Sequence, residues 1–154
     1  MILHKIHERI TLSISTEQAW DFFSNPHNLA VITPPELGLK VGSDVPERVY
    51  PGMIISYKIQ PLPGWKKLWV TEIKDIVQGE QFVDEQRFGP YKFWHHLHRL
   101  NTLNSGTEVE DIVHYSVPFS AFGGELIHSL LIKKQLKTIF EYRRNILTSL
   151  FPTE

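Results

Sequence analysis

Residues 81–117 read QFVDEQRFGPYKFWHHLHRLNTLNSGTEVEDIVHYSV, and three runs within this stretch alternate with a period of two residues. The runs lie within residues 82–88, 94–100 and 109–117, and this period is typical of β-strands with one buried face. Gly89-Pro90 and Asn104-Ser105-Gly106 separate the runs and are common turn sequences. The stretch therefore predicts three consecutive antiparallel strands joined by tight turns.

The same alternation continues toward the N-terminus and predicts further strands at residues 3–14, 53–59 and 65–77, with a weaker candidate at 37–45. Two short helices are expected between the first strand and this weaker candidate. Ser15 and Gln18 have the spacing of a capping box, and Pro26 suits the first position of a second helix.

The last 27 residues change to helical spacing, with no proline before Pro152. At about 1.5 Å per residue, such a helix is about 38 Å long and can lie across a whole sheet. The net charge between Glu125 and Phe151 is +3, and a basic amphipathic helix can lie on a membrane, but a solvated outer face over a packed inner face is the favoured interpretation. The expected apolar face comprises Leu126, Ile127, Leu130, Leu131, Ile139, Phe140, Ile146, Leu147 and Leu150.

These elements predict an α+β fold in a single domain spanning residues 1–154. About seven antiparallel strands form a curved sheet wrapped on the long C-terminal helix, with two short helices between strands 1 and 2. A single helix cannot fill the concave face of such a sheet, so we expect a hollow between them. Phe119 and Phe122 would lie at its rim.

Composition narrows the chemistry. The 154 residues include no cysteine, which excludes disulfides, thiolate metal sites and a cysteine nucleophile. A net charge of −1 offers no general attraction to nucleic acid. No apolar window is long enough for a transmembrane helix and no secretory signal is visible, so a cytoplasmic location is expected. No motif indicates a cofactor, and the oligomeric state cannot be read from the sequence.

Several local sequences resemble the SRPBCC superfamily, the START-like or birch-pollen-allergen-like proteins with a helix-grip fold. They are residues 10–23, 25–29, 32–35, 89–98 and 111–118, so the resemblance covers essentially the whole chain. It is most specific to an uncharacterised bacterial subgroup described as ligand-binding or cyclase-like. The resemblance implies a cavity for a hydrophobic molecule, but the superfamily hosts many functions and no catalytic set is carried over.

Strand parity predicts which side chains share the concave face with the final helix. Most are apolar, but the polar ones must pair, bind water or meet a ligand. The predicted ligand-binding set is Tyr57, Trp69, Thr71, Asp84, Gln86, Trp94, His96, His98, Asp111 and Tyr115. His95 falls on the opposite parity and is expected at the surface.

His96 and His98 stand two residues apart on one strand face, and four interpretations remain open. They form a hydrogen-bonded network with Asp84, Gln86 or Asp111; they orient a ligand headgroup; they bind zinc or iron with one carboxylate; or they act as acid and base. Our leading hypothesis is a non-enzymatic protein that binds a lipid, polyketide-like, quinone-like or aromatic molecule, without metal.

Two further functions are weighed against this hypothesis. A cyclase, dehydratase or hydrolase would use His96 or His98 with Asp84 or Asp111 in the same cavity. An interaction module would instead have a sealed interior and a large exposed apolar patch.

Overall fold

A computed structural model of the protein describes residues 2–42, 44–62, 64–118, 126 and 128–152. Its strands form one antiparallel sheet in the order β1-β7-β6-β5-β4-β3-β2. Phe119 and Phe122, predicted at a pocket rim, and Ile127, predicted on the helix face, lie outside the described residues. The strands are β1 (His4–Leu12), β2 (Lys40–Val41), β3 (Ile54–Leu62), β4 (Trp65–Val77), β5 (Gln81–Phe88), β6 (Phe93–Leu103) and β7 (Gly106–Ser116). The helical segments are the α-helices α1 (Thr16–Phe23) and α3 (Lys133–Leu150), the 3-10 turns η1 (Pro26–Leu29) and η2 (Pro35–Leu37), and the π-helical turn η4 (His128–Ile132).

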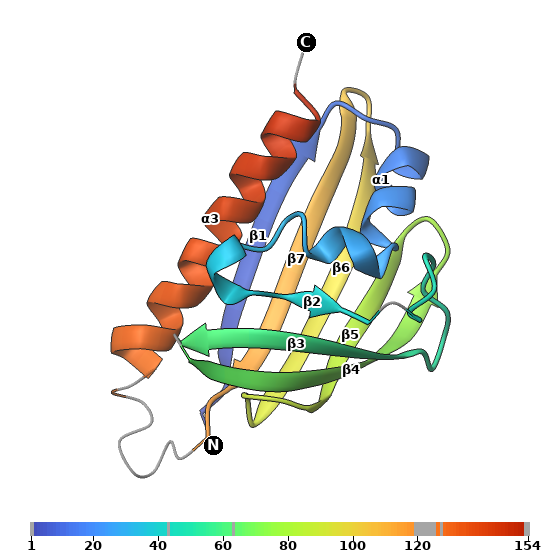
Figure 1. The fold of residues 1–154 in the computed structure, drawn as a ribbon. Helices are drawn as coiled ribbons and strands as arrows, with labels where there is room; N and C mark the ends of the chain where they lie inside the picture. The colour runs from blue at the N-terminus through green and yellow to red at the C-terminus, as the bar shows by residue number, and fades with distance from the viewer. Residues whose placement is uncertain (1, 43, 63, 119–125, 127, 153–154) are drawn as a thin grey trace.

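The predicted helix-grip architecture is confirmed. The curved sheet carries α3 along its concave side, and α1 and η1 lie beside the sheet (Figure 1). Register shifts within β4 at Val70–Thr71 and Lys74–Val77 mark irregular pairing with β5. Such bulges bend a strand and increase its twist. The β3–β4 hairpin consequently crosses the direction of β1, β7 and β6 (Figure 1).

The two short helical segments are confirmed in place, but the second is shorter than predicted and ends at Leu29. Ser15 accepts a hydrogen bond from the Gln18 backbone, while the Gln18 side chain accepts one from the Ser15 backbone, completing the predicted capping box. Pro26 begins η1, which is a 3-10 turn. The weak strand candidate at residues 37–45 shrinks to the two residues of β2.

The C-terminal helix differs from the prediction in its first turns. Leu126, Leu130 and Leu131, expected on the packed face, are 64%, 62% and 58% exposed, and Leu150 is 47% exposed. The π-helical turn η4 precedes the regular α-helix, whose 18 residues span about 27 Å. Because π-helical bonds change the residue spacing per turn, one 3.6-residue period cannot place both segments on the same face. Among the described helices, none is both long and apolar enough to cross a membrane.

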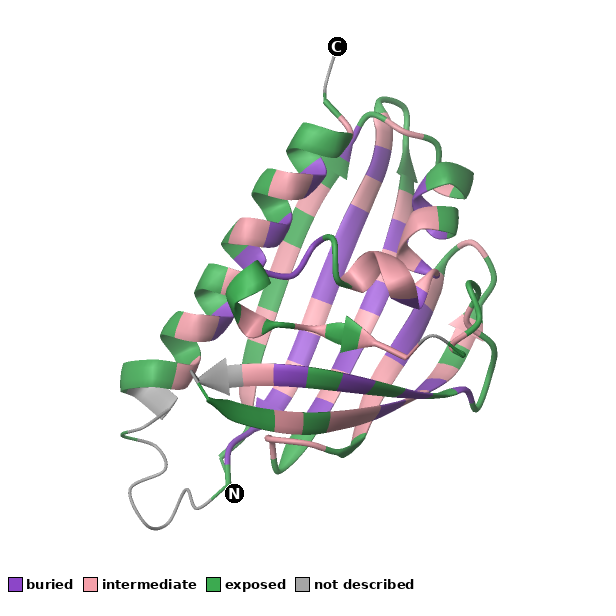
Figure 2. Cartoon of the chain, in the orientation of Figure 1, coloured by how far each residue is buried: buried purple, intermediate pink, exposed green. Residues whose placement is uncertain are grey.

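The buried side of α3 is formed by Leu136, Phe140, Arg143 and Leu147. Buried residues also follow alternate positions along β6 and β7 (Figure 2). Two apolar clusters result: one contains Leu100, Val109 and Leu147, and the other contains Trp94, Val113 and Phe140. The residues between these clusters on the same three elements are polar, and they define the candidate site.

Candidate functional site

A polar layer divides the apolar interior of the protein in two. The strand register places His98 opposite Asp111 and Asp84 opposite His96, so strands β5, β6 and β7 each contribute to it. Helix α3 adds Arg143, one turn from Phe140 on one side and from Leu147 on the other. We call these five side chains, Asp84, His96, His98, Asp111 and Arg143, the polar cluster; its members other than Asp84 are at most 9% exposed.

The two imidazoles of the polar cluster stack against each other between two carboxylates. Their ring centroids are 3.7 Å apart, with the planes tilted by 32°. His96 donates its Nε2–H to Asp111 Oδ1 at 2.8 Å, and His98 donates its Nε2–H to Asp84 Oδ2 at 2.7 Å. The second nitrogen of each ring faces the other carboxylate, at 3.4 Å from Asp84 for His96 and 3.3 Å from Asp111 for His98. Each carboxylate therefore meets one nitrogen of each imidazole.

The electrostatics of the polar cluster separate its two histidines. Burial and the nearby His98 lower the pKa of His96, and its hydrogen bond to Asp111 does not offset them. Burial also acts to lower the pKa of His98, but its contacts with Asp111 and Asp84 outweigh it, so this pKa is raised. The arrangement favours one imidazolium, at His98, over two.

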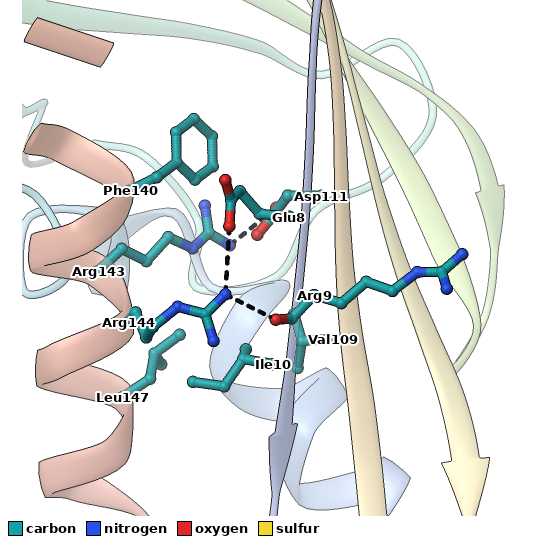
Figure 3. Close-up of a pocket in the computed structure, with 9 residues that line it drawn as sticks. All are labelled: Glu8, Arg9, Ile10, Val109, Asp111, Phe140, Arg143, Arg144 and Leu147. Carbon is teal, nitrogen blue, oxygen red and sulfur yellow. Dashed lines mark hydrogen bonds and ion pairs between the residues drawn. The ribbon is translucent and has the colours of Figure 1, made fainter. Parts of the chain in front are cut away.

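Arg143 is the countercharge of the polar cluster. Its Nη2 lies 3.1 Å from Asp111 Oδ1, and both side chains are nearly fully buried. Burial acts to raise the pKa of Asp111, but Arg143 and the two imidazoles hold it well below its ordinary value. In Figure 3 the next residue, Arg144, diverges from this site and binds Glu8 and the Arg9 carbonyl at the surface.

Asp84 lies on the other side of the stacked imidazoles. Trp94 donates its Nε1–H to Asp84 Oδ1 at 3.2 Å, which leaves Oδ2 facing the imidazoles. Burial acts to raise the pKa of Asp84, but His96, His98 and Trp94 together lower it. The neighbouring Tyr57 has a raised pKa because it is buried and lies near this carboxylate. Tyr57 is thus a neutral hydroxyl at the edge of the polar cluster.

A cavity of about 50 Å³ adjoins the polar cluster between the sheet, α1 and η1. Asp84, His98 and Arg143 form the charged part of its wall. The remaining lining residues are Phe22, Phe23, Asn25, Pro26, Asn28, Leu29, Ile32, Val49, Ile55, Tyr57, Ile73 and Phe82. Such a volume holds a few water molecules, whereas pockets for drug-sized ligands span roughly 300–1,000 Å³. The expected hollow is therefore present but small.

Three buried nitrogens of the polar cluster lack an aligned hydrogen-bond partner among the residues that the structure describes. They are His98 Nδ1, Arg143 Nε and Arg143 Nη2, the last of which makes its ion pair with Asp111 without hydrogen-bond alignment. A buried donor without an acceptor costs about 1–3 kcal/mol. These groups have unused capacity, and both residues line the cavity.

The structure places the ten predicted ligand-binding residues in different surroundings. Asp84, His96, His98 and Asp111 come together in the polar cluster, and Tyr57 lines the cavity beside it. Trp69, Trp94 and Tyr115 instead pack with Tyr91 in an aromatic group beside the cluster. Thr71 is 2% exposed, and its hydroxyl has no hydrogen-bond partner among the described residues.

Gln86 serves the neighbouring turn. It donates to the Tyr91 carbonyl at 2.7 Å and accepts from the Tyr91 amide at 3.3 Å, which ties the Gly89-Pro90 turn to β5. A Cβ at Gly89 would collide with the Gln86 side chain, so a larger residue there would displace Gln86 from these contacts. These contacts do not place Gln86 beside the imidazoles.

Arg143 is the member of the polar cluster that the sequence interpretation missed. It appeared only in the charge count of the final helix. The signal was its spacing: Leu136, Phe140, Arg143 and Leu147 repeat at intervals of three and four residues. A cation at the third of these positions on a packed face needs a buried counterion, and Asp111 provides it.

Comparisons with known proteins support the architecture. No protein-family model matches the chain, and no curated protein matches its sequence. Protein CV1439 from Chromobacterium violaceum matches at 16% identity and a TM-score of 0.72, over 98% of this chain and 99% of that one. The Zhui aromatase/cyclase from Streptomyces sp. R1128 matches at 10% identity and 0.74, over 97% and 93% of the two chains. Major latex-like protein 151 from Panax ginseng matches at 13% and 0.67, over 98% and 99%.

These likenesses confirm the predicted helix-grip fold. Because the identities are low, they do not transfer an activity.

Proposed function

We propose that the protein binds one small amphipathic molecule in the cavity between the sheet and α1, η1 and α3. The apolar body would lie among the aliphatic and aromatic walls, and a polar head that accepts hydrogen bonds would meet Arg143 and His98. The class includes fatty acyl, aromatic, polyketide-like and quinone-like molecules with a carboxylate, carbonyl or hydroxyl group.

One observation carries this proposal: mostly apolar walls, with Asn25, Asn28 and Tyr57 among them, surround buried nitrogens whose donor capacity is unused. An acceptor on the ligand would satisfy Arg143 Nε, which removes a desolvation penalty present in the empty site. Ligand sites commonly combine apolar walls with a few polar groups that fix orientation. A buried ion-pair network is often no more stabilising than apolar side chains of similar volume, which favours a role other than stability for the polar layer.

The small volume of the cavity sets a condition on binding. An acyl chain fits only if part of the wall moves outward. Pro26 and Leu29 of η1, with Ile32 and Val49, form the wall that is built from short, irregular segments. Such segments open at lower free energy than paired strands, so we expect this wall to yield.

Binding is tested by native mass spectrometry of protein purified from its own host and by displacement of a fluorescent naphthalene sulfonate probe. Dodecanoate and dodecanol are the competitors, because they share a tail and differ in the head. We expect both to displace the probe, with dodecanoate at least tenfold tighter because Arg143 is cationic. Failure of every amphipathic competitor to displace the probe, with no co-purified molecule, would contradict the proposal.

A matched pair of arginine variants separates the site from the surface. Arg143→Met keeps the length of the side chain and removes its charge and donors, so we expect the preference for dodecanoate to disappear. Arg144→Met changes the next residue, which faces Glu8 at the surface, and should leave the preference unchanged. Leu29→Trp fills the cavity from the opposite wall and should weaken the binding of dodecanoate and dodecanol to the same extent.

A second candidate function rests on the His98–Asp84 pair, which lies on the cavity wall. An imidazole held by carboxylates can act as a general acid or base, and the raised pKa of His98 favours the acid. In a dehydration of a β-hydroxy ketone, the His98 imidazolium would donate its proton to the hydroxyl, which leaves as water, and a second group would take the proton from the α-carbon. The aromatase/cyclase among the similar structures motivates this choice of substrate.

Catalysis is tested with the wild type and His98→Gln on a β-hydroxy ketone whose conjugated product absorbs in the near ultraviolet. Product formation that disappears in His98→Gln, with the fold retained, supports the enzyme. Equal rates of product formation with and without the wild-type protein would contradict the enzyme and leave only the binding function.

A further inference from the structure

The side of the polar cluster that faces Asp84 has the donor set of a transition-metal site. Asp84, His96 and His98 can each offer one ligand atom, and these atoms lie within 4.8 Å of one another. Asp84 Oδ2 is 2.7 Å from His98 Nε2 and 3.4 Å from His96 Nδ1. In a tetrahedral site with metal–ligand bonds of about 2.0 Å, neighbouring ligand atoms are about 3.3 Å apart. Ligand shifts of well under 1 Å therefore bring these two distances to that spacing.

Asp111 supplies the outer partner that a metal-binding histidine requires. A ligating imidazole usually donates its other N–H to a carboxylate, which fixes the tautomer and the ring orientation. His96 already donates Nε2–H to Asp111, so its Nδ1 is the nitrogen left toward Asp84. His98 points Nε2 toward Asp84 and donates its hydrogen there, so metal binding would displace that hydrogen and leave the other on Nδ1, which lies 3.3 Å from the same Asp111 oxygen. Both imidazoles thus present one nitrogen to a shared point.

The remaining contacts orient the carboxylates. Arg143 pairs with Asp111 and fixes it behind the imidazoles. Trp94 binds Asp84 Oδ1 and leaves Oδ2 for the shared point. With neutral imidazoles, these two carboxylates and one guanidinium leave a single uncompensated negative charge in a buried site, which either a bound proton or a metal cation neutralises.

We propose that Asp84, His96 and His98 bind one divalent transition metal of the zinc and iron(II) class, with Asp111 as the outer acceptor. Two imidazoles and one carboxylate suit these metals, whereas magnesium and calcium prefer sites made of oxygen ligands. Asp84 and His98 also line the cavity, so a fourth position for water opens there. This site does not depend on the amphipathic ligand proposed above.

The experiment uses untagged protein that is stripped with chelator, dialysed and titrated with Co²⁺, followed by competition with Zn²⁺. We expect saturation at one equivalent per chain, visible d–d absorption bands of low-coordinate Co²⁺, and displacement of Co²⁺ by Zn²⁺. A wild-type protein with no saturable uptake of either metal overturns the proposal, whether or not it binds amphipathic molecules.

Variants locate the metal. Asp84→Asn keeps the shape of the side chain, and its single amide oxygen can accept a hydrogen bond from His98 or from Trp94, but not from both as the two carboxylate oxygens do. With the fold verified by circular dichroism, we expect more than about 100-fold weaker Co²⁺ binding, beyond the 10–100-fold loss usual for outer partners. Trp94→Phe removes only an outer contact and should weaken binding within that 10–100-fold range.

The matched control lies on the opposite face of the same strands. His95 and His114 are cross-strand partners whose ring centroids are 6.4 Å apart. The double variant His95→Gln/His114→Gln should leave Co²⁺ binding unchanged. Co²⁺ binding that is lost in His95→Gln/His114→Gln, or that keeps its wild-type affinity in Asp84→Asn, overturns the proposal.

Discussion

Two carboxylates that are neighbours in the sequence lie back to back on β7 and have opposite surroundings. Asp111 faces inward, into the polar cluster, where its partners are as buried as it is. Glu110 faces outward and is itself only 4% exposed. His7, Arg9 and Arg99 surround it, and between 36% and 57% of each of their side chains is exposed. We call these four side chains the outer cluster.

The two clusters differ in how much of each ion-pair network is removed from water. In the outer cluster, only the carboxylate is buried, and it receives several cationic or hydrogen-bonding groups whose remaining surface stays in water, so the partners keep most of their hydration. In the polar cluster, two carboxylates, a guanidinium and two imidazoles are removed from water together, and the desolvation penalty can exceed the gain. A group of residues that weakens the core and carries shifted pKa values is a candidate for function.

The largest expected difference between the two clusters is in stability. Asp111→Asn leaves Arg143 buried without its counterion and deprives both imidazoles of a charged acceptor. Because breaking a buried ion pair typically costs about 3–5 kcal/mol, we expect the free energy of unfolding to fall by about that amount. Urea denaturation at pH 7 measures it. Glu110→Gln is the matched control, and equal losses in the two variants would show that the polar cluster is no more sensitive than the outer one.

The sequence predicted the inner face of the sheet well because alternation is a local property. Parity along β6 placed His96 and His98 together, and parity along the neighbouring strands placed Asp84 and Asp111 on the same face. It did not predict which nitrogen meets which oxygen, because that depends on register and on the stacking of the two rings. Arg143 was missed because a helix face had to be aligned with a sheet that was itself only predicted.

The outer cluster was also outside the reach of sequence patterns. His7 lies 2.6 Å from Glu110 although 103 residues separate them in the sequence, and no local spacing connects the two. The long side chains of neighbouring strands cover Glu110, which strand alternation alone does not predict. Likewise, the leucines of residues 126–131 looked packed because the helical period was extended through a segment that contains a π-helical turn.

A smaller effect concerns the pH dependence that Glu110 confers. Burial acts to raise its pKa, but hydrogen bonds from His7 and Arg9 outweigh it and the pKa is lowered. A carboxyl group whose pKa is lower in the folded state contributes stability above its unfolded pKa and loses it as the pH falls through the folded value. We expect the free energy of unfolding of the wild type to exceed that of Glu110→Gln by about 1 kcal/mol at pH 7. The difference is small because water screens the exposed partners of Glu110.

Unfolding curves at pH 7 and at successively lower values check this expectation. The advantage of the wild type over Glu110→Gln should be intact above about pH 4.3, the usual unfolded value, and should decline below it. Glu108→Gln, a neighbouring change on the same outer face, is the control for general acid effects. A constant difference between wild type and Glu110→Gln down to pH 2 would mean that ion pairing does not hold Glu110.

The smallest expected effect is a difference between the two clusters in how salt changes the stability that each carboxylate contributes. At 1 M NaCl the Debye length is about 3 Å, so charges that remain in contact with solvent are screened. The partners of Glu110 are exposed, and we expect the stability lost in Glu110→Gln to shrink by about 0.5 kcal/mol when NaCl is raised from 0.05 to about 1 M. The loss in Asp111→Asn should stay constant, because mobile ions do not reach a pair that is almost fully buried. Equal salt sensitivity of the two losses would mean that solvent and ions reach Arg143 from the cavity side, which would make the polar cluster an open site.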